Sequence, residues 1–392
     1  MHDLLLTNAQ LLDPGSGLDQ RGDIAFAGGK VAAIGAGLDR GKAKAVRDVG
    51  GAYVVPGLID MHAHVYRDGT ALSVDAELLL RRSGTTTALD VGSAGAGNIA
   101  GLFSLVQPTT SCRLLGLVNI GHGGIFETWP GCHMPEVEDY RLLNVKACAA
   151  AVRKHRPHTV GVKVRIGRSS SGTAGAEPLH MAIRAAEMAA DAETPFVPVM
   201  VHVGGELPPT LEEILDPLRP GDILTHCCSP KDNSVIAPNG KARESALRAK
   251  ERGVIFDVGH GMGSFGFDTC AAMMQQGLTP DVISSDVHVG CVDGPAYDVL
   301  VTMSKFLHLG MSFPEIVRRA TATAAKAMGW PQLGVLQEGG IGDATVLSIV
   351  DQRVRLTDSI GAIRTADRHL VCRGSVAGGK WFDADPSPSP LA

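Results

Sequence analysis

The feature that most constrains this chain is an alternation of short β-rich runs with stretches of helical composition between residues 53 and 328. This alternation is typical of a parallel sheet wound with helices. Eight strand and helix units in about 275 residues have the size of a (β/α)8 barrel, which is the predicted fold, and an open doubly wound sheet is the alternative. The eight runs are 54–61, 85–91, 113–120, 159–166, 197–203, 222–227, 254–258 and 281–286.

The two ends of the chain have a different pattern. Residues 2–50 and 341–382 contain short β-rich segments separated by glycine turns. We expect these segments to pair into one small β-sandwich domain built from both chain ends. The predicted organisation is a small domain of residues 1–52 and 335–382, a barrel of residues 53–334 and a disordered tail of residues 383–392.

Charge and composition exclude several classes of protein. The chain has 36 Lys and Arg against 41 Asp and Glu, a net charge of −5, and no run of five basic residues, so it lacks the electrostatic footprint of a nucleic-acid-binding protein. No apolar stretch reaches the roughly 18 residues of a membrane-spanning helix, and no signal peptide is recognisable. The eight cysteines show no C-x-x-C spacing and indicate reduced thiols. We therefore expect a cytoplasmic protein whose partner is a small molecule, not nucleic acid or a membrane.

Metal-binding residue types gather where the predicted strands end. The first run leads into His62-Ala63-His64. In a strand His62 and His64 point to the same side, about 7 Å apart, and can bind one metal ion. Lys163 lies inside the run 159–166, where an unpaired ammonium would be costly to bury. Both features call for a compensating partner at the same end of the sheet.

Three further runs end in His202, His226 and Asp286. The carboxyl ends of barrel strands are where barrel enzymes build their active sites. Each residue alone has an ordinary explanation, since a lone His226 is typical of a hydrogen-bonded core histidine and Asp286 could cap the next helix. Together with the first group they make six polar residues at five strand ends, and a centre of two metal ions would supply a partner for all of them.

These motifs resemble the amidohydrolase superfamily over nearly the whole chain. The segment 54–64, VVPGLIDMHAH, matches the amino-terminal signature of that superfamily at every position. The segment 320–329 and the glycines that follow it resemble the last barrel helix and the return into the small β domain. The resemblance therefore implies the same barrel with a small β domain, and it also suggests a homo-oligomer.

The resemblance to the dihydroorotase and hydantoinase type implies a ligand set. In that type a lysine on the fourth strand reacts with CO2 to form N6-carboxylysine and bridges two divalent metal ions, usually zinc, and Lys163 fits this position. The implied ligands are His62, His64 and Asp286 for the inner ion and His202 and His226 for the outer ion. A metal hydroxide would attack the substrate carbonyl, with Asp286 as the catalytic residue that takes the proton and passes it to the leaving group.

One position departs from the dihydroorotase pattern. That type has an arginine two residues after the second histidine, where this chain has Tyr66 followed by Arg67. The spacing is more similar to a deacetylase-type branch, whose implied substrates are small N-acyl or O-acyl carboxylic acids such as acetyl 2-hydroxy acids. The predicted activity is hydrolysis of the amide or ester bond of such an acid. The alternatives are a cyclic amidase of the dihydroorotase or hydantoinase kind and a non-enzymatic barrel scaffold, against which the complete ligand set argues.

Position along the strands suggests five substrate contacts. Tyr66 and Arg165 fall on the same faces as His64 and Lys163, one step nearer the mouth of the barrel. Arg165 could bind a carboxylate, and a structural ion pair is the alternative. The remaining candidates each follow a strand, could line the pocket or serve as core histidines, and are His122, His260 and His288.

Overall fold

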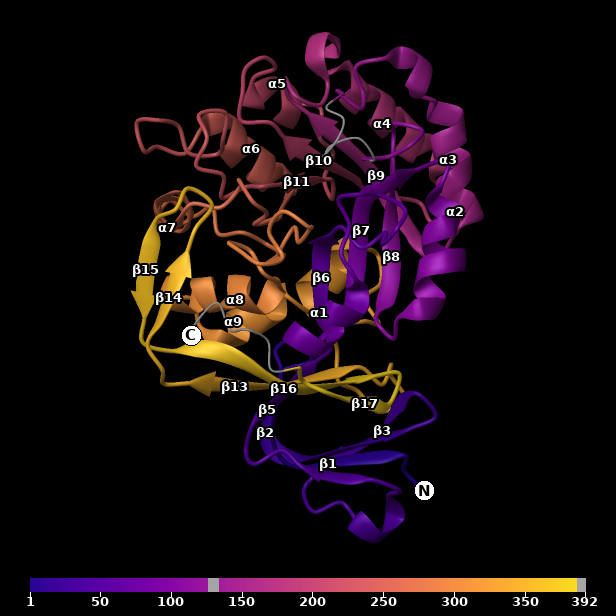
Figure 1. The fold of residues 1–392 in the computed structure, drawn as a ribbon, viewed down its shortest axis with the longest axis vertical. Helices are drawn as coiled ribbons and strands as arrows, with labels where there is room; N and C mark the ends of the chain where they lie inside the picture. Colours follow the sequence, from indigo (N-terminus) through magenta and orange to yellow (C-terminus); the bar gives the residue numbers. More distant parts are fainter. Residues whose placement is uncertain (126–133, 386–392) are drawn as a thin grey trace.

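The computed structural model describes residues 1–125 and 134–385 (Figure 1). Its main body is built on seven parallel strands in the order β12-β11-β10-β9-β8-β7-β6. These strands fall in seven of the eight predicted runs, so the prediction of a parallel sheet wound with helices is confirmed. Their bounds are β6 (Leu58–Ala63), β7 (Thr85–Gly95), β8 (Arg113–Asn119), β9 (Thr159–Ile166), β10 (Val199–Val203), β11 (Ile223–Thr225) and β12 (Ile255–Phe256).

The eighth predicted run, 281–286, is not a regular strand. Isolated parallel bridges join it to both edges of the sheet, Val282 to Asp257 and Val287 to Ala63. The backbone of Asp286 is left-handed, with φ at 48°, which interrupts extended geometry at the end of the run. The segment therefore contacts the last and the first strands of the curled sheet without continuous ladder pairing.

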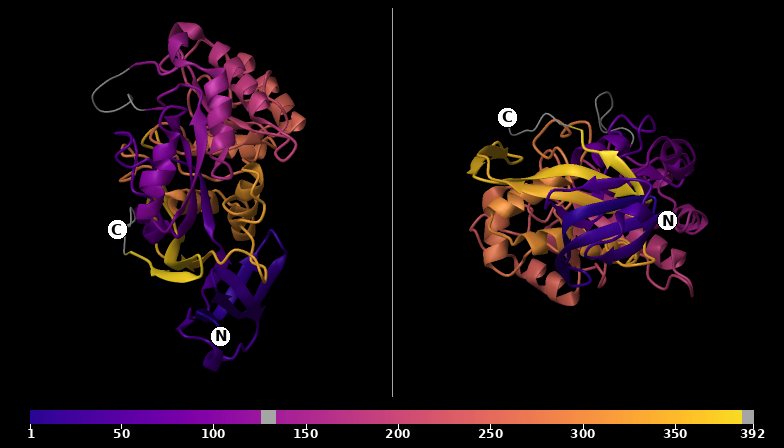
Figure 2. Two further views of the ribbon diagram at one scale, coloured as in Figure 1. Left: turned by 90° about the vertical axis from the view of Figure 1, so that its right-hand side faces the viewer. Right: turned by 90° about the horizontal axis from the view of Figure 1, so that it is seen from below.

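Helices follow the strands and cover the outside of the sheet (Figures 1 and 2). Local sequence sets their ends, as in the first helix, where the Asp75 side chain accepts from the Glu77 amide and Gly84 takes the left-handed conformation after the last turn. The helices are α1 (Ala76–Ser83), α2 (Ile99–Gly101), α3 (Val145–Lys154), α4 (Glu177–Ala189), α5 (Leu211–Leu215), α6 (Glu244–Arg252), α7 (Phe267–Gln275), α8 (Val299–His308), α9 (Phe313–Arg319) and α10 (Ala322–Ala327).

A second sheet of eight strands stands at one end of the molecule and combines strands from the first and the last described segments of the chain (Figure 2). Its order is β17-β16-β13-β5-β1-β2-β3, with β4 paired to β1. The strands β14 (Val354–Thr357) and β15 (Ile363–Ala366) form a separate hairpin. The members of the second sheet are β1 (Leu4–Asp13), β2 (Leu18–Ala27), β3 (Lys30–Gly35), β4 (Val46–Asp48), β5 (Tyr53–Pro56), β13 (Ala344–Val350), β16 (His369–Ala377) and β17 (Lys380–Asp383).

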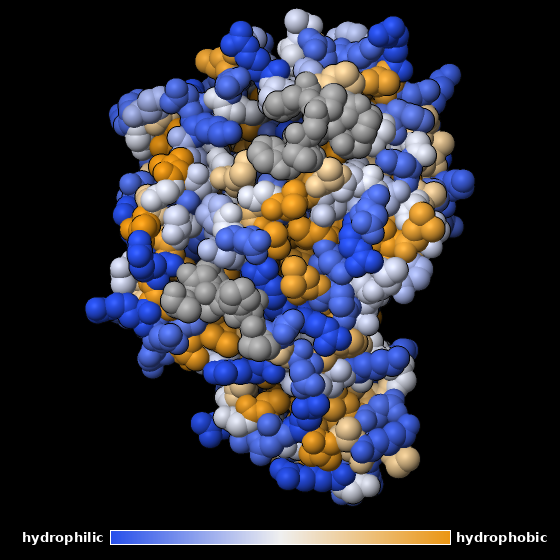
Figure 3. All heavy atoms as spheres, viewed as in Figure 1, coloured by the Kyte–Doolittle hydropathy of each residue, from blue (hydrophilic) through white to orange (hydrophobic). Residues whose placement is uncertain are grey.

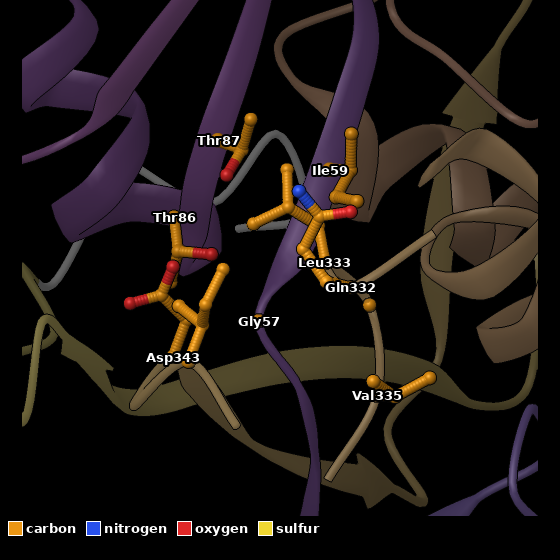
Figure 4. Close-up of a pocket in the computed structure, with 10 residues that line it drawn as sticks. Gly57, Ile59, Thr86, Thr87, Gln332, Leu333, Val335 and Asp343 are labelled. Carbon is orange, nitrogen blue, oxygen red and sulfur yellow. The ribbon is translucent and has the colours of Figure 1, made fainter. Parts of the chain in front are cut away.

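The predicted first run divides at Gly57, so that Tyr53–Pro56 joins the second sheet and only the later part joins the main sheet. A side chain at position 57 would collide with the Thr86 hydroxyl and lie 2.9 Å from Asp343 Cβ, so the close passage between the sheets requires glycine. A cavity of about 10 Å³, enough for one water molecule, lies beside this junction (Figure 4). Because β6 begins here, its carboxyl end points away from the second sheet.

The outer surface mixes residue types. The face drawn in Figure 3 carries hydrophilic and hydrophobic residues side by side. Among the described residues there is no helix with the length and apolar character needed to span a membrane. The seven cysteines of the described ranges are buried and unpaired, in line with the expected reduced thiols. Of the predicted tail, Asp383 ends β17, and residues 386–392 lie outside the described residues.

Candidate metal centre

Side chains from three strand ends converge at the end of the main sheet that faces away from the second sheet. His62 on β6, His226 after β11 and Asp286 offer ligand atoms that all lie within 4.8 Å of one another. Asp286 Oδ1 is 3.2 Å from His62 Nε2 and 3.2 Å from His64 Nε2. The structure thus brings together the three residues expected to bind an inner ion.

The expected outer pair, His202 and His226, is also in direct contact. His202 Nδ1 lies 2.6 Å from His226 Nε2. His226 Nδ1 donates to the Gly259 carbonyl at 2.7 Å, which leaves the lone pair of Nε2 facing His202. Burial lowers the pKa of His226 to about 3 and holds the pKa of His202 well below its ordinary value, so both rings are neutral at neutral pH. Two neutral imidazole nitrogens that are 2.6 Å apart are bridged either by a hydrogen-bonded proton or by a metal cation.

Lys163 on β9 lines the same cavity and is 1% exposed. Within the described residues its amine has one hydrogen-bond partner, the sulfur of Met200 at 3.4 Å. Burial lowers the pKa of Lys163 to about 8. Because of this lowered pKa, a larger fraction of the Lys163 amine is uncharged than in an ordinary lysine. The uncharged amine is the nucleophilic form. Addition of CO2 would convert this poorly partnered nitrogen into an anionic oxygen donor beside the histidines.

A buried carboxylate orients His62 from the side opposite Asp286. His62 Nδ1 lies 3.1 Å from Asp257 Oδ2 and 2.8 Å from Thr225 Oγ1. Asp257 also accepts from Thr225 Oγ1 at 2.7 Å and from Ser284 Oγ at 2.6 Å. Burial acts to lower the pKa of His62, but the carboxylates of Asp286 and Asp257 outweigh it and the net pKa is raised. The proton on Nδ1 leaves Nε2 free to bind a metal ion.

His64 has a similar support that sequence reasoning missed. Its Nδ1 is 2.8 Å from Ser93 Oγ, and the backbone amide of Ser93 donates to Asp90 Oδ1 at 2.9 Å. Asp90 and Asp257 are both fully buried and stand inside predicted β-rich runs. A charged residue in an apolar run is the signal that identified Lys163, so the same signal could have found these two carboxylates.

Two of the predicted ligands have a strained backbone. His226 and Asp286 adopt left-handed conformations with φ at 67° and 48°. Each such non-glycine residue costs roughly 1–3 kcal/mol and is concentrated at functional sites. Opposite Asp286, Gly261 has φ at 55°, and a side chain there would collide with Asp286 Oδ2. The absence of a side chain at Gly261 therefore leaves room for the carboxylate of Asp286, whose backbone is left-handed.

A cavity of about 230 Å³ opens onto the cluster and is lined by two of the five predicted substrate contacts. Arg165 lines it with its guanidinium 2.9 Å from Glu136 Oε2. His288 Nδ1 accepts from the Gly290 amide at 3.1 Å, which places the ring proton on Nε2, and burial lowers the pKa of His288 to about 4. Besides these and the ligand candidates, the lining consists of Leu72, Ile125, Lys231, Met262, Gly263, Ser264 and Gly290.

The other three predicted contacts are not part of this lining. The Tyr66 hydroxyl donates to the backbone carbonyl of Asn98 at 2.9 Å, with the ring buried in the core. His122 is exposed. His260 is fully buried, and its Nε2 accepts from Lys305 Nζ at 2.6 Å. Strand alternation does not extend to Tyr66, because β6 ends at Ala63 and the chain turns toward the core beyond it.

Known proteins are similar to this chain over most of its length. The sequence model of the Amidohydrolase family matches residues 53–380. A deacetylase of Agrobacterium fabrum is 32% identical over 384 residues, which cover 97% of this chain and 92% of the relative. A deacetylase of Enterococcus faecalis is 31% identical over 385 residues, which cover 97% and 99%.

Solved structures are also similar to this chain over nearly its whole length. The crystal structure of an adenine deaminase superposes with a TM-score of 0.89 and 31% identity, over 98% of this chain and 100% of that chain. The crystal structure of a dihydroorotase has a TM-score of 0.87 and 30% identity, with the same two coverages. The names differ although the identities are nearly equal, so these proteins share a family and not one substrate. The chain is therefore a hydrolase that belongs to the Amidohydrolase family.

Proposed function

We propose that this chain is a binuclear metal-dependent hydrolase that cleaves the amide or ester bond of a small acylated carboxylic acid. The observation that carries the proposal is a cluster in which His62, His64, His202, Asp286 and the buried Lys163 line one cavity of about 230 Å³ and His226 lies directly behind them. The fold proposed for it is a (β/α)8 barrel closed by the segment 281–286, with a small β-sandwich formed by both chain ends.

The donor set fits two divalent ions. Imidazole and carboxylate ligands suit zinc, and the short contact between His202 and His226 is one that a shared cation would relieve. When bound, such ions would activate a water molecule and polarise a carbonyl. The proposed ligands are His62, His64 and Asp286 for one ion, His202 and His226 for the other, and Lys163 as N6-carboxylysine between them.

The chain's own residues would then orient the substrate and move protons. Burial acts to raise the pKa of Asp286, but His62 and His64 outweigh it and hold the pKa well below its ordinary value, so Asp286 is ionised at neutral pH. As an ionised carboxylate it can accept a proton from the attacking water and pass it to the leaving nitrogen or oxygen. His288 carries its proton on Nε2 and can donate a hydrogen bond to the substrate.

The second candidate is a cyclic amidase, which the TM-score of 0.87 with a dihydroorotase favours. Two positions argue against it. Tyr66 stands where the dihydroorotase pattern has its arginine, and Arg67 pairs with Asp75 at 2.5 Å and does not line the cavity. An open-chain acylated acid is therefore the preferred substrate class.

Metal content and turnover test the proposal together. The protein is expressed with zinc and bicarbonate and then assayed with acetyl esters and N-acetyl derivatives of small acids, against hydantoins and dihydroorotate. About two ions per chain and turnover of the open-chain set are expected. Turnover of the rings alone would transfer the protein to the cyclic amidases, and fewer than about 0.2 ions per chain would reject the metal-dependent mechanism.

A further inference from the structure

Among the described residues, the cationic side chains that line the cavity besides Lys163 are Arg165 and Lys231. Arg165 already has a carboxylate partner, because its Nη1 lies 2.9 Å from Glu136 Oε2. The side chains of the pair are only 16% and 7% exposed, and Glu136 also accepts from Asn119 Nδ2 at 3.3 Å. A substrate carboxylate at Arg165 would meet the charge of Glu136 in a poorly solvated place, so Arg165 is a weak anchor for an anion.

Lys231, in the loop after β11, differs from Arg165 in having no such partner. Within residues 1–125 and 134–385 its ammonium forms no ion pair and no hydrogen bond. Its stem crosses Gly205, where a Cβ would lie 2.6 Å from Lys231 Cβ and collide with Cδ. Its Nζ approaches Gly263, at 3.8 Å from the position a Cβ would take. The absence of a side chain at Gly205 thus leaves room for the lysine stem, and the ammonium lies beside Gly263 of the cavity lining.

Among the described lining residues outside the proposed metal ligands, Arg165 and Lys231 are the cationic side chains, and the other side chains offer an anion at most a neutral hydrogen bond or an apolar surface. Leu72, Ile125 and Met262 are apolar, and His288 Nδ1 already accepts from the Gly290 amide at 3.1 Å. A ligand with a negative group and an apolar group would therefore place the negative group at Lys231 and the apolar group on the other lining residues.

We propose that Lys231 binds the carboxylate of the substrate and makes this cavity select acylated acids over neutral esters and amides; the proposal rests on the proposed hydrolase function. A carboxylate held there takes no part in breaking the acyl bond. The interaction is present in both the ground state and the transition state, so it lowers KM more than it changes kcat.

The test compares Lys231→Met, Lys231→Arg and a matched control, Lys241→Met. Lys231 and Lys241 are both exposed in the same loop, but Lys241 does not line the cavity. With an acylated acid, Lys231→Met should raise KM by about 10–100-fold with kcat nearly unchanged, because a hydrogen bond to a charged group is lost. The methyl ester of the same acid should be unaffected, Lys231→Arg should recover most of the loss, and the control should match the wild type.

Binding of phenylacetate and phenylacetamide, measured by calorimetry on the metal-loaded protein, gives a readout that needs no turnover. Phenylacetate should bind the wild type more tightly than Lys231→Met by the same 10–100-fold, and phenylacetamide should bind both alike. Equal losses for the acid and the neutral compound, or no loss at all, would overturn the role of Lys231. A wild type that binds phenylacetate through Lys231 and hydrolyses no acylated acid would reject the proposed function and leave this assignment standing.

Discussion

The contact between Asp257 and His62 offers a direct test of the metal centre. Asp257 is fully buried and accepts from Ser284 Oγ at 2.6 Å and Thr225 Oγ1 at 2.7 Å, with His62 Nδ1 at 3.1 Å. The substitution Asp257→Asn preserves the size of the side chain but removes its charge. It also replaces one acceptor oxygen by an NH2 group that has to face a donor.

The expected loss follows from the role of Asp257 in holding the tautomer of His62. Removing the hydrogen-bond partner of a metal-binding histidine typically weakens metal binding 10–100-fold, or about 1.4–2.8 kcal/mol. Asp257 is also one of two carboxylates that raise the pKa of His62, so its replacement lowers that pKa. Protons then compete less with the metal in the variant than in the wild type. The difference in affinity should therefore be largest near pH 8 and smaller near pH 6.

Zinc affinity is measured by competition with a chromophoric chelator at both pH values, with circular dichroism to verify that the apoproteins are folded. The matched control is Asp268→Asn, which removes an exposed carboxylate that pairs with Arg364 at 2.7 Å. The control should bind zinc as the wild type does. A folded Asp257→Asn protein with wild-type zinc affinity near pH 8 would refute the assignment of His62 as a ligand oriented by Asp257.

Three further predictions concern other parts of the site. Lys163→Ala should lose metal and turnover, with partial recovery in added formate or acetate; metal content measured by atomic absorption that stays at the wild-type level would contradict a bridging role. Gly261→Ala should reduce turnover at least about 10-fold by displacing Asp286, whereas Gly240→Ala, also at positive φ but with open space around it, should not; equal kinetics of the two variants would contradict the steric argument. Burial lowers the pKa of Lys305 to about 7, so its buried charge destabilises the fold below that pH and the cost is relieved as the pH rises toward its unfolded value. In urea unfolding the stability of the wild type relative to Lys305→Met should therefore increase between about pH 7 and pH 9, and a constant difference would show that this lysine does not titrate there.

Much of the site was predictable because each ligand candidate stands at or near the end of a β-rich run. Alternation in a strand gives the face of a side chain, and parallel strands bring their carboxyl ends together, so His62 and His202 could be placed without knowledge of the strand order. The same reasoning predicted the parallel sheet. It missed the division at Gly57, because a strand that passes from one sheet into another has the same apolar composition on both sides of the passage.

The predicted contacts that do not line the cavity lie beyond the ends of strands. Alternation applies only while the backbone is extended, and β6 ends at Ala63, so the direction of Tyr66 depended on tertiary packing that the local pattern does not contain. His260 likewise follows a strand, but a lysine 45 positions later in the chain donates to it at 2.6 Å and keeps it in the core. By contrast, Asp90 and Asp257 lie in or next to β7 and β12, where alternation and burial still apply. A charged residue inside a buried run has to be paired, so the residues that support the histidines were as accessible to sequence reasoning as the histidines themselves, whereas contacts made by loops were not.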